Sequence, residues 1–170
     1  PECNTELIRT EGDAKHYCPN EFGCAPQITG RIQHYISRKA MDIDGLGGET
    51  VDLLRKEGLI QNYADLYNLK IEQIIPLERM AEKSALNILK ALEASKSTTL
   101  PRFIYGLGIR HVGEATAKEF AKHFGTLDNL MNADEEALLQ VADVGPVVAK
   151  SVISFFAQPH HQEIVAQLRA

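Results

Sequence analysis

The chain has 170 residues, of which 44% are hydrophobic, so it can form one ordinary domain or two small ones with a packed core. No apolar run approaches the roughly 20 residues of a membrane-spanning helix, and residues 1–10 have no signal-peptide pattern. The 18 basic and 23 acidic side chains give a net charge of −5. This charge excludes nucleic-acid binding through a global positive field, so local geometry and local Lys or Arg residues would have to supply such affinity.

Residues 1–28 are polar and rich in turns, and they predict a small zinc-finger-like knuckle. Gly12-Asp13 is a hairpin signal between two short strands expected at residues 7–9 and 15–17. The remaining residues, 29–170, read as helical. We therefore expect a mostly α fold in which a knuckle precedes a helical domain.

The three cysteines of the chain, Cys3, Cys18 and Cys24, all lie in this first segment. An odd, clustered set without a secretion signal favours metal ligands over disulfides. Two ligand pairs around a β-hairpin would form a four-cysteine structural zinc site, whose usual first pair is Cys-x-x-Cys. We expect the partner of Cys3 to stand one place before Pro1. His16 is a strained substitute, and a metal-free knuckle stays open as the alternative.

A helix is expected at residues 25–41, where Ile28, Ile32 and Ile36 share one face. Aromatic residues are scarce, so the core should consist of Leu, Ile, Val and Ala. A polar joint is expected at residues 96–101. Further helices are expected at residues 49–58, 64–67, 71–75, 83–95, 114–124, 134–141, 147–156 and 161–170.

Four copies of one pattern run through the helical part. Each copy reads apolar, any, any, apolar, Gly or Ala, three residues, then a small apolar residue. The closing Gly or Ala positions are Gly47, Ala81, Gly113 and Gly145, which are 34, 32 and 32 residues apart. Such a period marks a repeated supersecondary unit, here a helix, a tight bend and a second helix. The repeats are centred near residues 43–54, 77–92, 109–123 and 141–156.

Glycine suits such a bend for two reasons. A tight reversal often needs a positive φ, and a phosphate can approach main chain that carries no Cβ. The amides that begin the second helix attract phosphate, and a basic or hydroxyl side chain in the next turn adds to the grip. The candidate DNA-binding residues are Gly45, Gly47, Gly48, Thr50, Arg79, Lys83, Arg110, His111, Gly113, Thr116, Lys118, Gly145, Lys150 and Ser151.

The four copies are unequal. The first has two glycines, the third and fourth have one each, and the second has none. The second copy is therefore expected to be chiefly structural, although Arg79 and Lys83 could reach a phosphate with their side chains. A surface or capping position is expected for the histidines other than His16, namely His34, His111, His123, His160 and His161.

Two other classes of function compete with duplex binding. In a protein-interaction scaffold the helices would dock a partner and the glycines would serve only as turns. A base-excision glycosylase carries one such hairpin beside a catalytic Asp or Lys, and its iron–sulfur forms have four cysteines near the C-terminus. All cysteines here are N-terminal and the hairpin is repeated four times, which disfavours the glycosylase.

Five motifs resemble the C-terminal half of the bacterial NAD-dependent DNA ligases, and they occur along the chain in the same order as in that family. Residues 17–27 look like the zinc finger of that family, and LGIRHVGEATAK at 107–118 is the most specific match, to the third hairpin. The other three motifs resemble its first, second and fourth hairpins, at residues 43–47, 77–87 and 141–149. The chain departs from the family in its missing first cysteine and its glycine-free second hairpin.

The resemblance implies a parent enzyme that uses NAD to seal nicks through enzyme-AMP and DNA-AMP intermediates. The chain has no Lys-x-Asp-Gly adenylation motif, so we expect it to be non-catalytic alone and not to bind NAD. NAD-binding, adenylation and OB-type domains would precede Pro1, and a BRCT-type module would follow Ala170. Structural Zn²⁺ is the implied cofactor of this part.

The resemblance also implies the partners. The implied job is to clamp nicked double-stranded DNA along its minor-groove phosphates, without reading bases, together with the other domains of the same ligase chain. The expected setting is the bacterial cytoplasm at the nucleoid, with no membrane.

Overall fold

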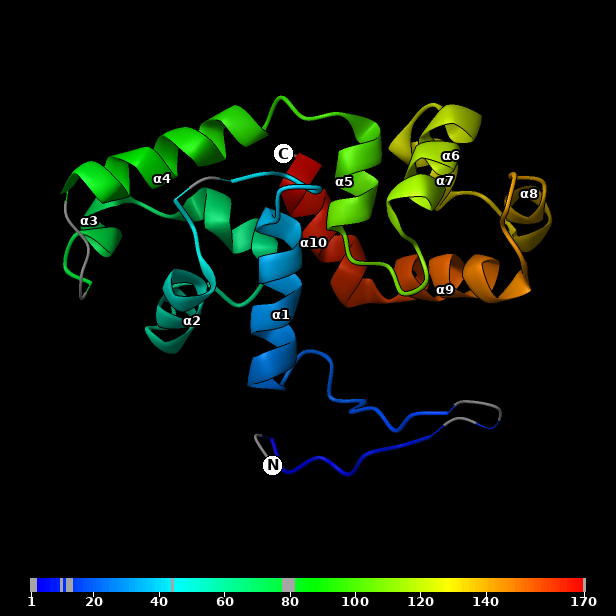
Figure 1. Cartoon of the computed structure of the whole chain (residues 1–170), viewed down its shortest axis with the longest axis horizontal. Helices are drawn as coiled ribbons and strands as arrows, with labels where there is room; N and C mark the ends of the chain where they lie inside the picture. The colour runs from blue at the N-terminus through cyan, green and yellow to red at the C-terminus, as the bar shows by residue number, and fades with distance from the viewer. Residues whose placement is uncertain (1–2, 10, 12–13, 44, 78–81, 170) are drawn as a thin grey trace.

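The computed structural model describes residues 3–9, 11, 14–43, 45–77 and 82–169. The described chain is mostly helical, as predicted, and none of its helices is long and apolar enough to span a membrane. In chain order the elements are α1 (Ala25–Ile36), α2 (Gly48–Lys56), the 3₁₀-helix η1 (Tyr63–Asn68), α3 (Ile71–Ile74), α4 (Glu82–Ser95), α5 (Leu100–Gly106), α6 (Glu114–Phe124), α7 (Leu127–Met131), α8 (Glu135–Leu139), α9 (Pro146–Ala157) and α10 (Pro159–Arg169) (Figure 1).

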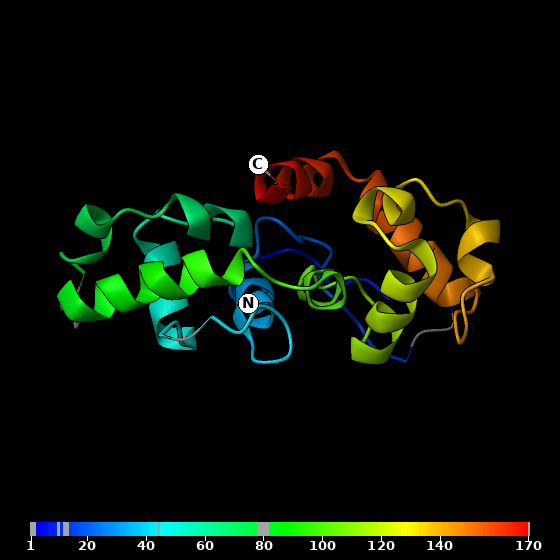
Figure 2. The ribbon, with the colours of Figure 1, turned by 90° about the horizontal axis from the view of Figure 1, so that it is seen from above.

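Helix α1 stands in the middle of the molecule. Helices α2 to α4 lie on one side of it and α5 to α9 on the other (Figure 1). Helix α10 turns back from α9 and packs against η1, so the last helix connects the two halves (Figure 2). The helices on both sides of the bends are therefore held by α1, from early in the chain, and by α10, from late in the chain.

Two of the short helices begin with an ordinary side-chain cap. The Thr126 hydroxyl accepts a hydrogen bond from the Asn129 amide at the start of α7, and the Asp134 carboxylate caps α8. Helix α7 was not expected from the sequence. The predicted polar joint is wrong at its end, because α5 already begins at Leu100 and Pro101 is well tolerated in a first helical turn.

The N-terminal predictions need two corrections. Within the described residues, the two expected strands reduce to one antiparallel bridge, in which Ile8 and Tyr17 exchange two backbone hydrogen bonds of 2.8 Å. The turn residues Gly12 and Asp13 lie outside the described part of the chain. The first helix ends at Ile36 instead of residue 41, because Ser37 adopts an extended backbone.

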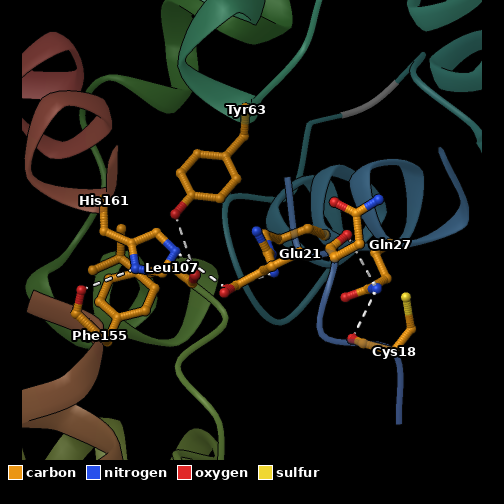
Figure 3. A network of polar contacts seen from close by, with 9 residues as sticks. Cys18, Glu21, Gln27, Tyr63, Leu107, Phe155 and His161 are labelled. Atoms are coloured by element: carbon orange, nitrogen blue, oxygen red, sulfur yellow. Dashed lines mark hydrogen bonds and ion pairs between the residues drawn. The ribbon is translucent and has the colours of Figure 1, made fainter. Parts of the chain in front are cut away.

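A tyrosine cluster occupies the centre of an otherwise mainly aliphatic core. The Tyr35 ring stacks on Tyr63 at 4.6 Å, and its hydroxyl lies 2.8 Å from that of Tyr67. The Tyr63 hydroxyl donates to the Leu107 carbonyl at 3.2 Å, just before the third bend (Figure 3). Burial raises the pKa of Tyr35 and of Tyr63, so both rings remain neutral. The cluster thereby ties α1 and η1 to the second half of the chain.

The small residue of each repeat is buried. Val51, Ala85, Ala117 and Ala149 all have 0% exposure. Each lies four residues after the closing position of its bend, where a larger side chain would separate the packed helices.

Replacing Ala117 with Leu should lower the free energy of unfolding by about 1–3 kcal/mol, because extra methyl groups overpack a filled site. Lys118→Ala, next in the chain but exposed, is the control and should change it by less than about 0.5 kcal/mol. Urea unfolding measures both variants. Equal stability of the two would contradict close packing at Ala117.

Candidate nucleic-acid interface and metal centre

The first, third and fourth bends share one geometry. Gly47, Gly113 and Gly145 are the N-cap residues of α2, α6 and α9, and all three have extended backbone with φ of −107°, −92° and −98°. The amide four residues further on donates to each glycine carbonyl, at 3.0, 2.9 and 3.1 Å. The three helices therefore begin in the same way at each bend.

Among the described residues, nothing requires glycine at these three positions. Any residue adopts an extended backbone. A Cβ built on Gly47, Gly113 or Gly145 would meet no atom within 4 Å, and the three residues are exposed or half-exposed. The space beside each main chain is open to an approaching group from outside the chain.

In each of these three bends, the left-handed residue lies two positions before the closing glycine. Gly45 occupies it in the first bend with φ of 87°, as expected. In the third and fourth bends the residues are His111 at 69° and Asp143 at 64°. The expectation that glycine supplies the positive φ is therefore wrong for these two bends, because His and Asp tolerate the left-handed region better than most residues.

No side-chain hydrogen bond caps α2, α6 or α9 in the described structure. The first amides of a helix have no partner within the helix, and together with the helix dipole they favour an anion. Pro146 begins α9 and has no N–H, so the fourth bend offers one donor fewer.

The charged side chains around the bends differ in their surroundings. Glu114 at the start of α6 lies 3.7 Å from Lys118 and 3.9 Å from Lys39, so both cations offset its charge. Lys83 and Lys150 are exposed and have no ion pair within the described residues. The Arg110 guanidinium lies over the Tyr17 ring, 5.2 Å from its centroid.

The other predicted residues fall into three groups. Thr50, Thr116 and Ser151 are half-buried in the first two turns of their helices. A Cβ on Gly48 would lie 2.5 Å from Nε2 of Gln33, the end of a flexible side chain that can move aside. Arg79 and the rest of the second bend, residues 78–81, lie outside the described residues.

The three predicted metal ligands meet at the base of the knuckle. The sulfur atoms of Cys3, Cys18 and Cys24 all lie within 4.8 Å of one another, and those of Cys3 and Cys18 are 3.6 Å apart. Tetrahedral zinc with Zn–S bonds of about 2.3 Å holds its sulfurs about 3.8 Å apart. The arrangement therefore fits a structural zinc ion, and the described part of the chain adds no fourth His, Cys, Asp or Glu ligand to the group.

The thiols of this cluster differ in acidity. The side chain and backbone of Thr5 lower the pKa of the Cys3 thiol to about 6, which favours the thiolate, whereas burial and the neighbouring Cys3 raise the pKa of the Cys18 thiol. Cys24 is the N-cap of α1, and the Gln27 amide of the same helix donates to the Cys18 carbonyl at 3.1 Å (Figure 3). Zinc bound here would cross-link both arms of the knuckle to α1.

The structure corrects the prediction for one histidine. His161 is only 1% exposed, and its ring stacks on Phe155 with centroids 3.9 Å apart. Its Nδ1 lies 2.9 Å from the Phe155 carbonyl oxygen and therefore donates to it. The signal that could have found it is its register in α10, where it shares a buried face with Ile164 and Val165.

Comparisons with known proteins agree with this architecture. A helix-hairpin-helix motif family matches residues 102–165, and the C4 zinc finger domain of NAD-dependent DNA ligases matches residues 1–25. Over 169 residues the chain is 56% identical to a DNA ligase of Christiangramia forsetii, 53% to one of Flavobacterium psychrophilum and 50% to one of Phocaeicola vulgatus. The resemblance to bacterial DNA ligases is confirmed. The alignments cover 99% of this chain but only 25–26% of each ligase, so the chain spans about a quarter of these enzymes.

The ligase-type zinc finger yields a test of its metal ligands. The 170-residue chain should bind about one zinc ion, and Cys24→Ser should lose it, because zinc prefers thiolate to a hydroxyl ligand. His16→Ala should retain it, since His16 is not part of the thiol cluster. Elemental analysis after gel filtration measures the metal content. Loss of zinc in His16→Ala would make this histidine a ligand.

Proposed function

We propose that this chain is the sequence-independent, duplex-binding part of an NAD-dependent DNA ligase and clamps the backbone around a nick. In this proposal residues 1–28 form the zinc knuckle and residues 29–170 the helix-hairpin-helix domain. The observation that carries it is the repeated glycine at three bends, where no contact with the described residues requires glycine. A phosphodiester strand that approaches the main chain would require it.

The proposed contacts are hydrogen bonds from helix-start amides to phosphate oxygens. Such contacts fix a protein on DNA without reading the bases. Lys83, Arg110, Lys118 and Lys150 would add positive charge beside the bends, which an acidic protein needs at the contact itself. At the second bend, Arg79 with Lys83 would act through side chains instead of a glycine turn.

The nick-sealing chemistry would belong to other domains of the ligase chain. The 170 residues contain no Lys-x-Asp-Gly motif, so no lysine here is set to carry AMP. NAD would accordingly bind elsewhere in the enzyme. The proposed partners are nicked duplex DNA and those remaining domains, and the proposed location is the bacterial cytoplasm at the nucleoid.

Duplex binding should be weak and strongly salt-dependent. If four cations each displace one counterion, the logarithm of the binding constant should fall with that of the salt concentration with a slope of about −4. Fluorescence anisotropy with labelled nicked and intact duplexes of two unrelated sequences measures the salt dependence of the affinity and any preference for a nick or for a sequence. Absence of binding at low salt would favour a protein-interaction scaffold, and a strong sequence preference would contradict phosphate clamping.

Replacing Gly113 with Val should weaken duplex binding by at least about tenfold, since one charge-assisted amide–phosphate bond is worth about 1.5–3 kcal/mol and about 1.4 kcal/mol is a factor of ten. Gly30→Val is the matched control, because a Cβ on Gly30 also meets nothing within 4 Å but lies in the middle of α1, away from a bend. Anisotropy gives affinity and circular dichroism gives helicity. An unchanged affinity for Gly113→Val would contradict amide contact at the third bend.

A further inference from the structure

The knuckle contacts the second half of the chain at two separate places, the third bend and the start of α10. Both places line a cleft of about 1050 Å³ that lies between the knuckle, the third bend and α9. At the first place, the Tyr17 ring lies under the Arg110 guanidinium. Tyr17 is the neighbour of the ligand Cys18, and Arg110 is the neighbour of His111, the left-handed residue of the third bend.

The Tyr17 ring beside the Arg110 guanidinium restricts where this side chain points. A cation–π contact leaves the guanidinium charged, so it can still attract a phosphate. Tyr17 therefore acts as a positioning residue for a cation at the third bend.

At the second place, Glu21 reaches α10. Its Oε1 lies 2.7 Å from Nη2 of Arg31 and 3.4 Å from Nε2 of His161 (Figure 3). Proximity to His161 and to the Arg31 guanidinium holds the pKa of the Glu21 carboxyl below its ordinary value, so it is ionised at neutral pH. Phe22, next in the chain, packs on the His160 ring at 4.1 Å.

His161 also contacts α9, so it links Glu21 to that helix. The His161 ring is held by the Phe155 ring and the Phe155 carbonyl, so its position is tied to the helix that begins at the fourth bend. Nε2 of His161 is buried and has no hydrogen-bond partner among the described residues, which leaves the Glu21 carboxylate at ion-pair distance as its counterpart.

We propose that zinc binding and duplex binding are coupled through these two contacts. The proposal rests on the proposed function. Glu21 lies between Cys18 and Cys24, and Tyr17 adjoins Cys18, so zinc that organises these thiolates also fixes both contact residues. Zinc thereby orients Arg110 at the third bend and holds the C-terminal end of α9, the helix that begins at the fourth bend. By linkage, bound DNA tightens zinc binding by the same factor.

The test measures duplex affinity of the 170-residue chain with zinc and after removal of zinc by a chelator. Zinc removal should weaken wild-type binding about tenfold, within the roughly 5–150-fold range of coupled sites. In the double variant Tyr17→Leu/Glu21→Gln, the ratio of duplex affinity with zinc to that without zinc should fall towards one, although all three cysteines remain. Asp128→Asn is the control, because it breaks the exposed pair that Arg169 of α10 makes with Asp128, away from the knuckle; its zinc effect should stay near tenfold.

A second measurement keeps the inference separate from folding. Competition with a chromophoric chelator gives the zinc affinity with and without duplex, and duplex should raise it about tenfold in the wild type but not in the double variant. The single variants Tyr17→Leu and Glu21→Gln should each show part of the loss. If zinc-loaded wild type does not bind duplex, the proposed function fails. If it binds duplex equally with and without zinc, or the double variant keeps the full zinc effect, only the coupling is overturned.

Discussion

The side chain four residues after each bend controls how closely the two helices of a repeat can pack. Ala117 and Ala149 are fully buried there, and their amides close the first helical turn on the carbonyls of Gly113 and Gly145. With the apolar residues on either side of the bend also buried, the main chain between them is forced outward. A packing requirement thus determines which amides reach solvent, before any ligand is considered.

Helix α1 contacts both the segment before the third bend and the knuckle. His34 donates to the Tyr105 carbonyl at 2.6 Å, which holds the helix against the segment before the third bend. At its other end, Gln27 and Arg31 hold the knuckle through Cys18 and Glu21. One helix of 12 residues therefore contacts the metal site, the tyrosine cluster and a bend, which explains why these distant features have fixed relative positions.

The sequence predicted best what repeats. The spacing of Gly47, Gly113 and Gly145 located the starts of α2, α6 and α9, because an N-cap and a buried small residue are local features with a fixed separation. The clustering of the cysteines likewise indicated their meeting point.

What escaped prediction depends on contacts between distant segments or on very short helices. The burial of His161 is set by Phe155 and Glu21, and Glu21 lies at the opposite end of the chain. Helix α7 has only five residues, too few for a clear hydrophobic period. The left-handed backbone of Asp143 is imposed by its place in the bend, and an Asp residue tolerates that backbone but does not predict it.

Arrays of identical helical repeats are usually open-ended, so each unit contacts only its neighbours and stability grows almost additively with length. Here α10 reaches past the later repeats to η1, which is far earlier in the sequence. The α10–η1 contact joins the late part of the array to its early part. Adding or removing a repeat between them would break this contact. The two halves should therefore unfold in a single cooperative transition, and the long chain separation of the α10–η1 contact should make folding slower than in a linear array.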